Sequence, residues 1–333
     1  MPTEGRPRRR GRSGAIALGA LLAVVLVAAG LVVLLNRGVG LLPDPEGCRA
    51  EVDGVVVDLS TEQAENASTI SAVAVRRGLP ARAVSIALAT AFQESKLRNL
   101  DHGDRDSLGI FQQRPSQGWG TARQIRDPYY AANKFYDELQ KVDGYQTMRI
   151  TEAAQKVQRS GYPEAYQDHA AEARALASAL SGNSPATFTC VVGGGADLAT
   201  QGTGPRGLTP RAAAVRRSLL RAFGGDLSLG GFAPGGVTTG HMKGSAHYDG
   251  RAVDVFVRPV TADNRRRGWA VASYLVAHAA RLDVDHVIFD GRIWSAGPRS
   301  GSGWRVYDPG SARGDRVVLE HRDHVHVDVA PGD

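Results

Sequence analysis

The chain has 333 residues, enough for more than one domain, and a formal net charge of +6. Five arginines and one glutamate in the first twelve residues account for +4 of this charge, so everything after them carries only +2. The basic balance therefore belongs to the N-terminal end, and we expect no nucleic-acid partner.

Residues 14–35 form an uncharged run rich in Ala, Val and Leu. A helix of this length can cross about 30 Å of hydrocarbon. The preceding arginines predict a cytoplasmic tail at residues 1–13 and an extracytoplasmic location for everything after the helix. A cleaved signal peptide is the alternative, but its apolar region is usually shorter, about 7 to 15 residues. We expect a single-pass membrane anchor at the cell membrane.

The two cysteines flank the first globular segment, residues 49–185. Cys48 comes just before it and Cys190 just after it. In the oxidising compartment that the predicted topology implies, a disulfide between them would tie the ends of the segment together. The alternative, two unpaired thiols, is uncommon in an exported protein.

Residues 49–185 carry helical patterns with clear start signals. Ser60 and Gln63 form a capping box, and Asp127 precedes Pro128 at the start of another helix. Between these helices, residues 81–97 are apolar and carry one acid near their end, Glu94. A carboxyl group buried against an apolar helix has a raised pKa and can act as a general acid near neutral pH.

The dipeptide Glu94-Ser95, followed by the block Gly109-Ile-Phe-Gln-Gln-Arg-Pro115, resembles the signature of the lytic transglycosylases and goose-type lysozymes. The resemblance implies an all-α domain that cuts the glycan strands of peptidoglycan. It makes Glu94 the catalytic acid/base and places Ser95 and Gln112 in the substrate cleft. Residues 153–162 lack the Tyr-Asn pair of the family's next motif.

Two alternatives remain open for Glu94. It is either catalytic or a surface acid paired with Arg98 one helical turn on. If it is catalytic, a hydrolase needs a second carboxylate, and a lytic transglycosylase uses a hydroxyl of the sugar instead. Candidates for the second carboxylate are Asp101, Asp104 and Asp106.

Residues 191–207 are rich in Gly, Thr and Ala and predict a flexible linker.

In the region after this linker, residues 208–331, two stretches suggest a metal site: Ser245-Ala-His-Tyr-Asp-Gly-Arg-Ala-Val-Asp254 and Asp323-His-Val-His326. As a strand, residues 324–329 place His324 and His326 on one face. A catalytic zinc ion takes three ligands from His and carboxylate and keeps a position for water. The alternative is a structural role, in which the histidines only pack in a small core, as we expect of His278 and His286.

The first of these stretches reproduces the pattern S-x-H-x-x-G-x-A-x-D of the D-alanyl-D-alanine carboxypeptidases and related zinc peptidases, which it resembles. The resemblance implies an α+β domain in which zinc is bound by His247, Asp254 and His326. It places Ser245 in the substrate site and the catalytic acid/base at Asp323, with His324 an equally good candidate. Ala233 lies in a segment where many relatives carry an arginine, and Lys243 and Arg251 are the possible substitutes.

The predicted fold is thus one transmembrane helix, an all-α lysozyme-like domain (49–185), a linker and an α+β zinc peptidase-like domain (208–331). The predicted function is a membrane-anchored peptidoglycan hydrolase that cuts glycan strands and stem peptides. The alternative is a non-catalytic cell-wall-binding or assembly protein that retains both folds.

Overall fold

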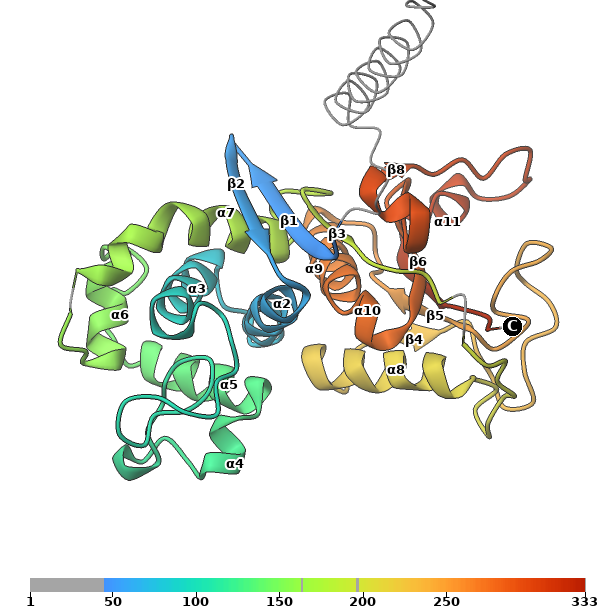
Figure 1. Cartoon of the computed structure of the whole chain (residues 1–333). Coiled ribbons are helices and arrows are strands. Elements are labelled where there is room, and N and C mark those ends of the chain that lie inside the picture. The colour runs from blue at the N-terminus through green and yellow to red at the C-terminus, as the bar shows by residue number, and fades with distance from the viewer. Residues whose placement is uncertain (1–44, 163, 196–197, 333) are drawn as a thin grey trace, which may run out of the picture. The chain divides into compact units, whose positions relative to one another are not determined.

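The computed structural model describes residues 45–162, 164–195 and 198–332. From Glu46 onwards the chain forms one compact unit (Figure 1). Within the described ranges no helix is both long and apolar enough to cross a membrane. This finding contradicts the predicted fold class with its transmembrane helix and the predicted single-pass location. Residues 14–35, which carried both predictions, lie outside the described residues.

The all-α description of the first region is also wrong, because that region begins with a β-hairpin. The strands β1 (Gly47–Val52) and β2 (Val55–Leu59) are joined at Asp53-Gly54, both of which have positive φ. An Asp-Gly pair between two strands is a strong signal for such a hairpin. The strand β3 (Phe188–Val191) completes an antiparallel sheet of order β2-β1-β3.

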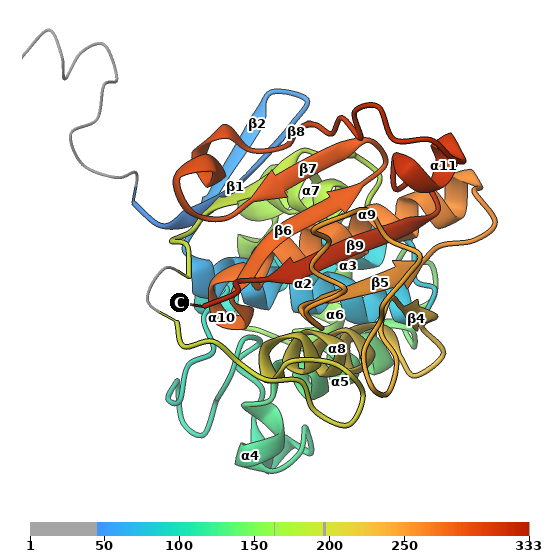
Figure 2. The same ribbon diagram turned by 90° about the vertical axis from the view of Figure 1, so that its right-hand side faces the viewer.

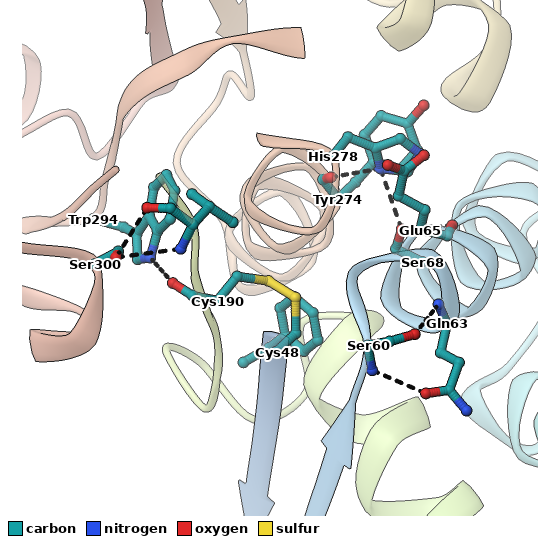
Figure 3. The surroundings of a disulfide bond; sticks show 12 residues. Cys48, Ser60, Gln63, Glu65, Ser68, Cys190, Tyr274, His278, Trp294 and Ser300 are labelled. Carbon is teal, nitrogen blue, oxygen red and sulfur yellow. Dashed lines mark hydrogen bonds between the residues drawn. A yellow bond between two sulfur atoms is a disulfide. The ribbon is translucent and has the colours of Figure 1, made fainter. Parts of the chain in front are cut away.

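A disulfide joins Cys48 to Cys190, as predicted from their positions in the chain. The two residues are direct partners in the register between β1 and β3. The indole Nε1 of Trp294, from the C-terminal region, donates to the carbonyl of Cys190 at 3.2 Å (Figure 3). The bridge therefore connects both ends of the first region at a point where the second region also makes contact.

Helices make up most of the first region. The predicted capping box of Ser60 and Gln63 begins α2 (Figure 3). Asp127 caps α5 ahead of Pro128, as expected. The helices are α2 (Thr61–Arg76), α3 (Ala81–Ser95), η1 (Pro115–Gln117), α4 (Ala122–Ile125), α5 (Pro128–Leu139), α6 (Ile150–Gln158), η2 (Ala165–His169) and α7 (Ala170–Leu180).

The second region is built on an antiparallel sheet of order β4-β5-β9-β6-β7-β8. Figure 2 shows this sheet in front of α9, which packs against β6 and β9. The strands are β4 (Leu229–Gly230), β5 (Ala252–Phe256), β6 (Val284–Phe289), β7 (Arg292–Ser295), β8 (Arg305–Val306) and β9 (His324–Val329). The helices are α8 (Pro210–Phe223), α9 (Ala262–Ala277), α10 (Ala279–Leu282), η3 (Gly297–Ser302) and α11 (Arg316–Leu319).

Helix α2 contacts both regions. It packs against α3 and α5 of the first and against α8 and α9 of the second, and every residue from 66 to 74 is buried. A helix buried on all sides lies inside a core rather than on its surface. Near it, the hydroxyl of Ser68 lies 3.3 Å from Nδ1 of His278 (Figure 3), and the hydroxyls of Tyr129 and Tyr274 lie 2.6 Å apart.

Candidate functional site

The central strands of the second sheet bring the predicted metal ligands together. Asp254 on β5 is the register partner of His326 on β9, and Asp254 Oδ1 lies 3.1 Å from His326 Nδ1. The turn before β5 adds His247, whose Nε2 lies 3.2 Å from Asp254 Oδ1 and 3.1 Å from His326 Nδ1. All three side chains are buried. Their three closest atoms form the ligand triangle.

Hydrogen bonds outside the ligand triangle fix which ring nitrogens carry protons. His247 Nδ1 donates to the carbonyl of Gly231 at 2.7 Å, and His326 Nε2 donates to Asp328 Oδ2 at 3.2 Å. Because a carbonyl and a carboxylate can only accept, the ring nitrogens that face Asp254 present lone pairs when the imidazoles are neutral. Such outer hydrogen bonds are typical of metal-binding histidines.

Three electron-rich atoms this close repel one another unless a cation lies among them. Zinc–ligand distances of about 2.0 to 2.2 Å set tetrahedral ligands about 3.3 Å apart, close to the spacing in the ligand triangle. Burial lowers the pKa of His326, but the carboxylates of Asp254 and Asp328 outweigh it and raise this pKa to about 9. Without a metal ion a proton therefore fills the place of the cation, and a bound metal ion displaces it.

Gly231 holds the backbone close to the ligand triangle, and Gly250 allows the turn after His247 to approach the segment at 203–207. A Cβ on Gly231, where φ is +77°, would lie 2.2 Å from His247 Cε1. A Cβ on Gly250, where φ is +66°, would lie 2.3 Å from the carbonyl oxygen of Gly207. Gly250 is one of the fixed positions of the motif S-x-H-x-x-G-x-A-x-D. Gly231 was missed, because it acts through a backbone carbonyl.

Of the two candidates for the acid/base, His324 lies nearer to the ligand triangle. Its Nε2 is 4.0 Å from Asp254 Oδ1, and its Nδ1 donates to Asp323 Oδ1 at 2.8 Å. Strand β9 begins directly after Asp323, whose other oxygen accepts from Arg258 Nε at 2.7 Å. Burial would raise the pKa of Asp323, but the hydrogen bonds from His324 and Arg258 lower it. Asp323 therefore orients His324 as an ionised carboxylate.

A pocket of about 370 Å³ opens over the ligand triangle. Ser245 and Lys243 line it, and Ser245 Oγ accepts from the backbone of His247 at 3.4 Å. Arg251 also lines the pocket, but it is held by the carbonyl of Val329 at 2.9 Å. Among the described residues Lys243 has no ion-pair partner. Six of the nine histidines line the pocket: His241, His247, His286, His321, His324 and His326.

In the first region, Glu94 lies in the last turn of α3 and accepts a hydrogen bond from the hydroxyl of Tyr166 at 2.7 Å. Burial raises the pKa of Glu94, and the hydrogen bonds from Tyr166 and Gln158 offset part of this rise. Tyr166 is fully buried in the short helix η2. No periodic pattern in the sequence pointed to Tyr166. Within the described residues Glu94 makes no ion pair with Arg98.

Ser95 and Gln112 both make hydrogen bonds around the block at 109–115. The buried Ser95 hydroxyl donates to the carbonyl of Ile110 at 2.7 Å, which ties the end of α3 to the block at 109–115. The amide of Gln112 donates to the carbonyl of Gly109 at 3.1 Å, within its own turn. From the segment that lacks the Tyr-Asn pair, Gln158 donates to the carbonyl of Phe111 at 2.8 Å.

The carboxylate of Asp106 is hydrogen-bonded within the loop that follows Glu94. Its Oδ1 accepts from Arg114 Nε at 2.7 Å and its Oδ2 accepts from the backbone of Ser116 at 2.8 Å. These hydrogen bonds hold the pKa of Asp106 far below its usual range. Asp101 pairs with its neighbour His102 at the surface. Asp106 thus serves to fold the loop after Glu94.

Comparison with known families gives one match. Residues 204–317, about a third of the chain, match the family described as VldE, C-terminal domain. The matched stretch includes His247 and Asp254 and ends before His326. Its description names neither of the two families that the motifs resemble. No curated protein matches the chain.

Proposed function

We propose that the chain is a peptidoglycan hydrolase with two reaction centres, a zinc-dependent peptidase centre at the ligand triangle and a glycan-cleaving centre at Glu94. The ligand triangle carries the proposal, because two buried imidazole lone pairs and a carboxylate converge beside an open pocket.

At the first centre, zinc held by His247, Asp254 and His326 would polarise an amide carbonyl and make a bound water more acidic. His324 keeps its Nε2 available, because its Nδ1 proton is engaged by Asp323. It can take a proton from the attacking water and return it to the leaving amine. The ammonium of Lys243 at the pocket can attract a carboxylate of the stem peptide.

At the second centre, Glu94 acts as the acid. Its raised pKa keeps it protonated to higher pH than an exposed glutamate, so that it can donate a proton to the glycosidic oxygen. Tyr166 donates a hydrogen bond to one oxygen of this carboxyl group. Asp106 is engaged by Arg114 and Ser116, Asp101 pairs with its neighbour at the surface, and the side chain of Asp104 is 94% exposed. We therefore favour the lytic route, in which a hydroxyl of the sugar attacks and no second carboxylate is needed.

The proposal is tested by digesting purified peptidoglycan with the full-length chain and identifying the released fragments by mass spectrometry. We expect His247→Ala to abolish peptide cleavage and retain glycan cleavage, and Glu94→Gln to do the reverse. His102→Ala and Glu152→Gln, at solvent-exposed positions, serve as matched controls. Equal fragment release by the wild type, His247→Ala and Glu94→Gln would reject both centres and favour the non-catalytic wall-binding alternative.

A further inference from the structure

A second group of metal-binding side chains lies on the strands next to the ligand triangle. The ligand atoms of Asp285 and His286 on β6 and of Asp328 on β9 all lie within 4.8 Å of one another. His286 Nδ1 is 3.0 Å from Asp328 Oδ1 and 3.5 Å from Asp285 Oδ2. All three residues line the pocket over the ligand triangle, so a cation from solvent can reach them.

An irregularity in β6 builds this group. Neighbouring residues of a regular strand point to opposite faces, so Asp285 and His286 would be separated by the sheet. The pairing of β6 with β9 shifts register between Val284 and His286. Such a bulge re-aims side chains and is common beside active sites. Here it allows two consecutive side chains to converge on Asp328.

The group also concentrates two carboxylates that no Arg or Lys of the described residues pairs with. The side chains of Asp285 and Asp328 are only 35% and 12% exposed. Within the described residues the imidazoles of His286 and His326 are the cationic groups at ion-pair distance from these carboxylates, and a divalent cation can supply further positive charge.

We propose that Asp285, His286 and Asp328 form a second divalent-cation site beside the first. One imidazole and two carboxylates suit a borderline or hard ion such as Zn²⁺ or Mn²⁺. Asp328 connects the two sites, because its Oδ1 faces His286 while its Oδ2 accepts the proton on His326 Nε2. A cation at the second site fixes Asp328 and, through it, the ring orientation of a ligand of the first site.

The test counts metal ions. The full-length chain is stripped with a chelator, saturated with Zn²⁺, separated from free metal and analysed by elemental mass spectrometry. We expect two equivalents for the wild type, one for Asp285→Asn, one for His247→Ala and none for the double variant. Asp249→Asn, whose side chain is 61% exposed, is the matched control and should bind two.

The two proposals fail in distinguishable ways. If Asp285→Asn and Asp285→Ala bind as many equivalents as the wild type, while circular dichroism shows them folded, the second site is refuted. If His247→Ala binds as many as the wild type while Asp285→Asn binds one fewer, the second site stands and the zinc-peptidase proposal falls.

Discussion

The sharpest prediction concerns Gly231, whose carbonyl orients His247. In Gly231→Ala the new Cβ would lie 2.2 Å from His247 Cε1 and 2.9 Å from Asp254 Oδ2. Carbon atoms in contact are about 3.5 Å apart, so the imidazole has to move by about 1 Å. Metal sites tolerate displacements of only about 0.2 Å in ligand distance. Since losing an outer hydrogen bond alone weakens binding about 10- to 100-fold, we expect zinc affinity to fall at least about 100-fold.

Gly235→Ala is the matched control, because it separates the steric clash from backbone strain. Gly235 has a similar φ, +82° against +77°, but a Cβ there meets nothing within 4 Å. Both variants place alanine in a left-handed conformation, which costs about 1 to 2 kcal/mol. Zinc affinity is measured by competition with a coloured chelator, and we expect Gly235→Ala to stay within about threefold of the wild type. Affinities of the two variants within threefold of each other would refute the role assigned to Gly231.

Two further predictions concern the first region. In Tyr166→Phe the carboxylate of Glu94 loses a hydrogen bond that stabilises its ionised form, so the pKa of Glu94 rises further and the alkaline limb of the pH profile for glycan cleavage moves to higher pH. The exposed control Tyr162→Phe should leave the profile unchanged. A shift of that limb to lower pH in Tyr166→Phe would contradict the role assigned to Tyr166. The substitution Cys48→Ser removes the disulfide and opens a loop with a sequence separation of 142. It should lower the free energy of unfolding by up to about 5 kcal/mol, measured by urea denaturation without reductant. A loss below about 1 kcal/mol would show that the disulfide contributes little to the stability of the fold.

Strand alternation and motif spacing predicted the convergence of the candidate metal residues. Alternation in residues 324–329 placed His326 on one face of a strand, and the pairing of β5 with β9 sets it beside Asp254. The start of β9 decided between Asp323 and His324, and a strand boundary is the part of a pattern that is hardest to read from sequence. His286 was expected only to pack, because the bulge that turns it toward Asp328 has no signature in the residue pattern.

The fold was harder to predict where short strands meet long-range partners. Residues 47–59 alternate in burial along β1 and β2 around an Asp-Gly turn, a hairpin signal that was overlooked beside the stronger helical patterns. The third strand, β3, pairs with β1 from the other end of the region, and no local pattern reveals such a partner. Tyr166 reaches Glu94 in the same way, from a short helix distant in sequence.

The burial of α2 between the two regions limits how the protein can be dissected. A truncation made between Val191 and Gly207 would leave one face of α2 without α8 and α9, and the Tyr129 hydroxyl without Tyr274. Excised halves would expose apolar surface and tend to aggregate. The two proposed activities, peptide cleavage and glycan cleavage, therefore have to be separated by point substitutions in the intact chain.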